Sequence, residues 1–117
     1  MTKAPARAVV AKKPQMSEDD LLSCVIDLAQ RLNWRVINFR PAQTAKGWRT
    51  AVQGDGKGYP DLTLLRGSRG MAVELKSARG QVSREQAAWL GAFLAAGWET
   101  HIWRPADWVE GVREVLT

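Results

Sequence analysis

The sequence is short of several residue types, and each shortage excludes a class of site. It contains one cysteine, Cys24, which cannot form an internal disulfide and is typical of a protein from a reducing compartment. It also contains one histidine, His101, so it lacks the ligands of a usual zinc site, and nothing places Cys24 and His101 together as a catalytic pair. No apolar run approaches the length of a membrane span, and the basic N-terminus lacks the hydrophobic region of a secretory signal. We therefore predict a soluble, cytoplasmic protein.

A phosphate-binding glycine loop is missing as well. Gly54, Gly56 and Gly58 stand close together, but no helix is predicted to open directly after them, as a nucleotide-binding fingerprint requires. We therefore expect no nucleotide cofactor.

Acidic residues are absent from the first fifteen positions, although the whole chain has a net charge of +5. This segment carries Lys3, Arg7, Lys12 and Lys13 among alanines and prolines, which is typical of a disordered arm. The arm could hold a phosphate backbone by counterion release, or it could be a solubilising leader without a partner. The remaining residues, 16–117, are enough for one compact domain.

Apolar spacing and capping residues predict the order of the elements. Ser17 begins a helix of about four turns, residues 34–39 read as a strand, and 40–58 form a long loop. A β-hairpin is predicted around residues 61–76, a helix at 83–96, and a strand at 98–103 that the helical crossover makes parallel to its neighbour. Pro105 starts a final helix. The predicted fold is α/β, with an αβββαβ core, a small mixed sheet flanked by helices and a short C-terminal helix.

The predicted hairpin carries charges within apolar runs on either side of a four-residue turn that has glycine at both ends. If Arg66 pairs with Met71, Asp61 lies opposite Lys76, and Glu74 shares their face. Two carboxylates would then be diagonal neighbours about 7 Å apart, a gap that a divalent cation with oxygen ligands fits. The alternative is a surface salt bridge on a solvated face. Strands that are apolar on both sides favour a covered sheet, in which these charges need compensation.

Pro60-Asp61 followed by Glu74-Leu75-Lys76 resembles the signature of the PD-(D/E)XK nucleases. The wider context over residues 17–110 is similar to the standalone form of the VRR-NUC (virus-type replication-repair nuclease) branch of that superfamily. The stretches that carry this resemblance are Gly58-Tyr59-Pro60-Asp61-Leu62, Val73-Glu74-Leu75-Lys76, Ser83-Arg84-Glu85-Gln86 with Trp89-Leu90, Ala96-Gly97-Trp98 and Trp103-Arg104-Pro105. The resemblance implies the same core fold.

The site residues and the chemistry point to metal-assisted phosphodiester hydrolysis. Asp61, Glu74 and the Leu75 carbonyl would hold one or two Mg²⁺ or Mn²⁺ ions, because oxygen ligands favour these ions over zinc. Lys76 would orient or help to deprotonate the attacking water.

The resemblance adds two further candidates. Gln86 matches a glutamine associated with the family's active site, although a capping box with Ser83 would also explain it. Glu18 matches an acidic residue that faces the metal site from the first helix. It is expected to point inward with Leu22, Val25 and Ala29, although helix capping alone would explain an acid there.

Basic residues in two loops are candidates for DNA contacts. The long loop has Lys46, Trp48, Arg49 and Lys57, and the loop after the hairpin has Arg79. Trp48 could stack on an unpaired base between two cations, or it could anchor the loop on the core.

The resemblance implies a homodimeric nuclease that favours four-way (Holliday) junctions. One chain has one site, so two symmetric cuts require a C2 dimer. No separate sequence-reading domain is present, which favours recognition of branched DNA by shape. The alternatives are a nuclease of the same superfamily that acts on flaps, ends or duplex DNA, and a non-catalytic DNA-binding module.

Overall fold

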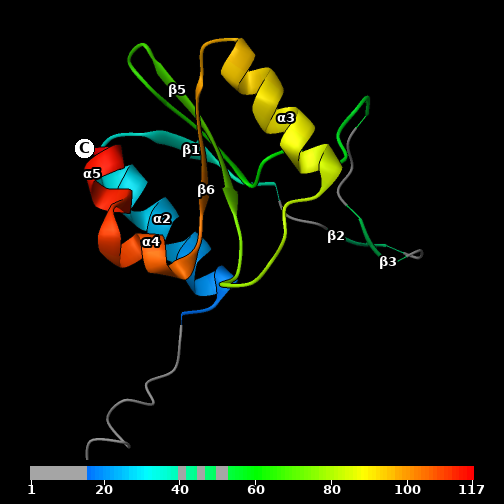
Figure 1. The fold of residues 1–117 in the computed structure, drawn as a ribbon, viewed down its shortest axis with the longest axis horizontal. Helices are drawn as coiled ribbons and strands as arrows, with labels where there is room; N and C mark the ends of the chain where they lie inside the picture. Colours follow the sequence, from blue (N-terminus) through cyan, green and yellow to red (C-terminus); the bar gives the residue numbers. More distant parts are fainter. Residues whose placement is uncertain (1–15, 40–41, 45–46, 50–52) are drawn as a thin grey trace, which may run out of the picture.

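The computed structural model describes residues 16–39, 42–44, 47–49 and 53–117. The arm predicted at residues 1–15 lies outside them. Figure 1 shows the arrangement of the ten elements in the described residues. In chain order they are α2 (Glu18–Arg31), β1 (Arg35–Ile37), β2 (Ala42–Thr44), β3 (Gly47–Arg49), β4 (Leu62–Arg66), β5 (Arg69–Leu75), α3 (Arg84–Ala95), β6 (Glu99–Trp103), α4 (Pro105–Glu110) and α5 (Val112–Leu116).

Four strands form a mixed sheet in the order β1-β4-β5-β6. The β1/β4 and β4/β5 pairs are antiparallel, and β6 returns parallel to β5 after the α3 crossover. Figure 1 shows α3 on one side of this sheet and α2, α4 and α5 on the other. The mixed sheet, its flanking helices and the parallel last strand confirm the predicted fold class.

The helix α2 covers one face of the sheet because its apolar residues recur every four positions. Leu21, Val25 and Ala29 are fully buried there. They pack on sheet residues from alternate positions of β4 and β5, which define the α2 face of the sheet. The α2-face residues of these two strands are Leu62, Leu64, Met71 and Val73. The intervening residues, including Thr63 and Glu74, lie on the opposite side, here named the α3 face.

The hairpin register differs from the prediction by two residues. Leu62 pairs with Val73 and Arg66 with Arg69, so the turn consists only of Gly67 and Ser68. Gly67 has φ +59, and such left-handed residues allow a two-residue turn whose twist matches the strands. Because the slip is an even number of residues, every side chain keeps its predicted face.

The long loop predicted at 40–58 is also wrong in part, because β2 and β3 form a separate two-stranded antiparallel sheet within it. The final helix is divided into α4 and α5, which meet at Gly111. Val112 and Leu116 turn into the core, whereas Val109 is 86% exposed.

Candidate active site

Glu74 is the only buried charged residue in the part of the chain that the structure describes, with 2% of its surface exposed. It lies on the α3 face near the end of β5, because side chains alternate along the strand. Its Oε2 accepts a hydrogen bond from Gln86 Nε2 at 2.6 Å and lies 3.4 Å from Lys76 Nζ. Its other oxygen, Oε1, is buried and has no hydrogen-bond partner among the described residues. A buried carboxylate oxygen without a partner is costly unless a ligand binds it.

Asp61 directly precedes β4 and is fixed by two hydrogen bonds. The Leu75 backbone N–H donates to Asp61 Oδ2 at 2.8 Å, and the Asn38 side chain donates to the Asp61 carbonyl at 2.7 Å. In a strand, the N–H and C=O of one residue point to the same edge. The Leu75 carbonyl therefore points toward the Asp61 side of β5, while Lys76 N–H bonds Trp103 on the β6 side.

The environment of Glu74 disfavours its charged form. Burial, followed by the negative charge of Asp61, raises the pKa of Glu74 from 4.5 to about 7, and Lys76 offsets only part of this rise. Two carboxylates and one lysine therefore leave an excess of negative charge in a partly dry site. Such a site favours a proton or a cation.

Gln86 both caps α3 and donates a hydrogen bond to Glu74. Its backbone N–H donates to Ser83 Oγ, and its Oε1 accepts from the Ser83 N–H at 2.8 Å, which completes a capping box. Because Oε1 is used by the cap, the amide nitrogen is directed at Glu74. The start of α3 thus fixes the orientation of one Glu74 oxygen.

Comparison with protein families gives a match to the VRR-NUC domain over residues 1–104. This chain belongs to the VRR-NUC family. The VRR-NUC domain implies a nuclease of the PD-(D/E)XK type, and a nuclease domain implies a DNA substrate. The resemblance inferred from the hairpin residues is thereby confirmed.

A solved structure described as a "VRR_NUC domain protein" shares this fold. Its TM-score is 0.53 at 20% sequence identity, and the match covers 88% of this chain and 87% of that one. Among curated proteins, none matches the chain.

The loop that leads into Asp61 is packed against the start of α3 in this VRR-NUC domain. Gly58 has φ +82, and a Cβ placed there would lie 2.6 Å from the backbone carbon of Glu85. Trp89 Nε1 donates to the Asp55 carbonyl at 2.9 Å. The two sides of the site, Asp61 and the α3 start with Gln86, are therefore held as one packed unit.

Arg104 is a residue that sequence reasoning missed. Its Nη1 donates to the carbonyls of Ser77 at 2.8 Å and Gly80 at 2.6 Å, so it anchors the loop that follows Lys76. The missed signal was the parallel pairing of the strands that end at Leu75 and Trp103, which brings the residues after both strands together. Asn38 was missed because its role depends on the β1/β4 register.

Glu18 does not point inward as predicted. It is exposed at the first position of α2, and no side-chain hydrogen bond or ion pair involves it within the described ranges. Glu18 is three residues before Leu21, in line with the buried stripe of Leu21, Val25 and Ala29, but it is the first residue of the helix and is exposed there. There it still interacts favourably with the helix dipole.

The predicted DNA contacts are spread over several elements. Lys46 lies outside the described residues, while Trp48 and Arg49 belong to β3. Lys57 and Arg79 are exposed, and Lys57 Nζ lies 3.9 Å from the Glu85 carboxylate. Of the two whose side chains the structure describes, Lys57 and Arg79, neither has a hydrogen bond or ion pair with Asp61 or Glu74.

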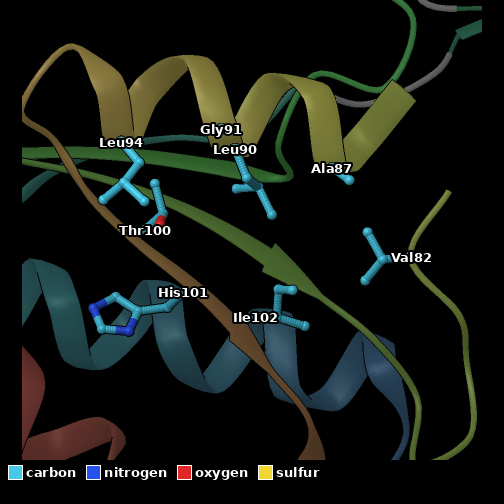
Figure 2. A pocket seen from close by; sticks show the side chains of 8 residues that line it. All are labelled: Val82, Ala87, Leu90, Gly91, Leu94, Thr100, His101 and Ile102. Atoms are coloured by element: carbon cyan, nitrogen blue, oxygen red, sulfur yellow. The ribbon is translucent and has the colours of Figure 1, made fainter. Parts of the chain in front are cut away.

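A separate apolar groove of about 280 Å³ lies on the neighbouring flank of α3, between that helix and β6. Figure 2 shows the residues that line it, with Thr100 toward α3 and His101 on the other side of β6. The lining residues are Val82, Ala87, Leu90, Gly91, Leu94, Thr100, His101 and Ile102. None of the predicted site residues lines this groove. Among the described residues, no helix is long and apolar enough to cross a membrane.

Proposed function

We propose that this protein is a divalent-metal-dependent, structure-selective DNA endonuclease that resolves four-way junctions as a homodimer. The observation that carries the proposal is the buried Glu74 carboxylate. One of its oxygens is bonded by Gln86 and lies near Lys76, and the other has no partner in the described part of the chain. Residues 16–117 would form the nuclease domain, and the basic segment 1–15 would add contacts to phosphates.

The residues present fit an Mg²⁺ or Mn²⁺ ion. Asp61 and Glu74 supply carboxylate oxygens, and the Leu75 carbonyl points to the Asp61 side. Burial and then the charge of Asp61 raise the pKa of Glu74, so a cation at the site would stabilise its charged form. The described residues contain no group of three or more His, Cys, Asp or Glu side chains suited to a metal ion. Two carboxylates and a backbone carbonyl would be the protein's share of ligands, a set typical of Mg²⁺ sites that keep several waters.

Each side chain of the cluster has a separate part in the proposed hydrolysis. When bound, the ion would acidify a water and stabilise the charge that grows on the phosphate. Lys76 offsets the charge of Glu74 and orients the attacking water. Gln86 holds Glu74 in one rotamer, and the Leu75 N–H holds Asp61. Exact positioning of this kind contributes much of the rate in phosphoryl-transfer sites.

The test is cleavage of a four-way junction, a flap and a linear duplex side by side, with and without Mg²⁺. We expect metal-dependent cleavage of the junction, and loss of cleavage in Asp61→Ala, Glu74→Ala and Lys76→Ala with the fold intact. Calorimetric titration with Mn²⁺ reports metal binding independently of cleavage. Full activity in purified Asp61→Ala would eliminate the proposal, and absence of Mn²⁺ binding would favour a non-catalytic DNA-binding module.

The homodimer follows from the number of sites. Symmetric resolution of a junction needs two cuts, and each chain supplies one cluster. Sedimentation at the concentrations used for cleavage should therefore give the mass of a dimer. A monomer that still cuts both strands of a junction would contradict this part, and preference for flaps, ends or duplex would assign a different substrate to the same chemistry.

A further inference from the structure

Phe39 exposes an aromatic ring next to the proposed active site. It lies two residues after the end of β1, and 54% of its surface is accessible. Its ring meets that of Tyr59 edge to face, with centroids 6.0 Å apart. Tyr59 stands two residues before Asp61, so the exposed ring lies beside the segment that carries the first carboxylate.

The ring is supported from behind by a continuous set of aromatic contacts. Tyr59 packs on Trp89 and Phe93, at 5.0 and 5.9 Å between centroids. Phe93 in turn packs on Trp98 at 4.9 Å. The rings behind Phe39 are only partly exposed, and Trp89 is further fixed by its hydrogen bond to Asp55. Phe39 is thus the outermost member of a packed aromatic layer, and a ring held in this way loses little entropy when a ligand stacks on it.

The strand register places Phe39 on the same face as the carboxylates. Ile37 pairs with Thr63, and side chains two residues apart share a face, so Phe39 and Asp61 both lie on the α3 face. The Asn38 side chain ties the two segments together through the Asp61 carbonyl. The helix α3 packs on β5 and β6, and among the described helices none packs to a similar extent on the α3 face of β1 and β4. Ile37 and Leu65 are about half exposed on this face. A DNA strand that reaches Asp61 from this side therefore passes Phe39.

We propose that Phe39 is a stacking platform for an unpaired base next to the scissile phosphate. The inference rests on the proposed nuclease function and adds that the base next to the cut is unpaired when it binds, either because it leaves its duplex at a branch point or because it belongs to a flap. Every base has a π-face, so a single aromatic platform is tolerant of sequence but demands that the base leave its duplex. Arg35, exposed on the same face, is suited to a phosphate further along the strand. A nucleic acid therefore fits the ring and the cation, and it fits the carboxylates through the proposed metal ion, which an apolar partner surface would not.

The experiment measures stacking without cleavage. A flap oligonucleotide with 2-aminopurine as the unpaired base at the branch is titrated in EDTA with wild type, Phe39→Ala, Phe39→Trp and the matched control Ile37→Ala. We expect quenching by wild type, Phe39→Trp and Ile37→Ala. Phe39→Ala should lose the quenching and bind about tenfold more weakly, since stacking on one base changes affinity by roughly 5- to 100-fold.

A cleavage assay then tests whether the Phe39 ring acts through the unpaired base. When an abasic site replaces that base, the cleavage rate of wild type should fall to the rate of Phe39→Ala. The cleavage rate of Phe39→Ala itself should not fall further. Equal losses of quenching and cleavage in Ile37→Ala and Phe39→Ala would overturn the proposal that Phe39 is a stacking platform. So would additive losses of cleavage rate from Phe39→Ala and from the abasic site. A drop in sedimentation mass for Phe39→Ala would instead assign the ring to a contact between two copies. Quenching without any cleavage by wild type would keep the platform and reject the nuclease function.

Discussion

At the scale of single residues, Glu74 is distinguished by its raised pKa, which links the stability of the fold to pH. Its pKa is raised to about 7, first by burial and then by Asp61, so the folded chain binds this proton more tightly than the unfolded chain does. Protonation of Glu74 therefore stabilises the folded state. Its contribution to the free energy of unfolding is fully present below pH 4.5, the ordinary pKa of a glutamate, and is lost as the pH rises toward 7.

We expect the metal-free protein to lose on the order of 2 kcal/mol of stability from this group between pH 5 and pH 8. Thermal unfolding in EDTA, followed by circular dichroism over this range, measures the loss. Glu74→Gln should flatten the profile, and the difference between the two profiles isolates Glu74. His101, whose pKa is lowered by burial, titrates in both proteins. Identical profiles for the two proteins would show that Glu74 is not the group responsible.

Gln86 can be separated from its capping partner by a pair of variants. Ser83→Ala removes the hydroxyl that caps α3 but leaves the Gln86 amide available to Glu74, so it should cost about 1 kcal/mol in stability and little in cleavage rate. Gln86→Ala removes both contacts and should lower kcat at least tenfold at a similar cost in stability. Steady-state cleavage and chemical denaturation of both variants are the measurements. Equal kcat values for Ser83→Ala and Gln86→Ala would show that Gln86 serves only as a helix cap.

At the scale of elements, the start of α3 and the loop before β4 are held by their close approach at Gly58. A side chain at this position would collide with the backbone of Glu85, next to Gln86. On the opposite side of the site, Arg104, which directly follows β6, donates hydrogen bonds that hold the loop after Lys76. The site is therefore the meeting point of four segments, and no single element contains it.

Gly54 supplies a matched control for Gly58, because both have positive φ, +84 and +82, and a Cβ at Gly54 would meet nothing within 4 Å. Gly54→Ala should cost only about 1 kcal/mol of backbone strain. Gly58→Ala adds a backbone collision that shifts the start of α3, so it should be less stable by a further 1–3 kcal/mol or so and should lose cleavage activity. Denaturant unfolding and cleavage rates compare the two variants. Equal behaviour would show that the loop moves away freely.

At the scale of the whole molecule, Arg66 connects the two ends of the described fold. Its guanidinium lies 4.5 Å from the centroid of the Trp34 ring and donates to the carbonyls of Leu32, Leu116 and Thr117. Trp34 adds an indole N–H to the Leu116 carbonyl at 2.8 Å. These bonds satisfy helix C-terminal carbonyls that would otherwise lack partners.

Arg66→Ala should therefore destabilise the fold by about 2 kcal/mol, with kcat unchanged once the folded fraction is accounted for. Arg113→Ala, which removes an exposed arginine from the same C-terminal helix, serves as the control and should stay within about 0.5 kcal/mol of wild type. Urea denaturation measures both variants. A loss of activity in Arg66→Ala beyond its loss of folded protein would mean that this end of the molecule also shapes the site.

The sequence by itself determined the four strands of the main sheet, the helices α2 and α3, and the face on which the charges lie. Alternation along a strand has a period of two, so Asp61, Glu74 and Lys76 share the α3 face in the predicted register and in the observed one. Short-range chemistry also predicted the Ser17 and Ser83 caps, because a capping box needs only residues three positions apart.

Tertiary structure decided everything that joins one element to another. The two-residue turn, the Gln86 contact with Glu74, the close approach at Gly58 and the Arg104 anchor all depend on distances between segments far apart in the chain. The exposure of Glu18 is of the same kind. A first-turn acid interacts favourably with the helix dipole whether it is buried or exposed, so only the packing of α2 on the sheet decides its exposure.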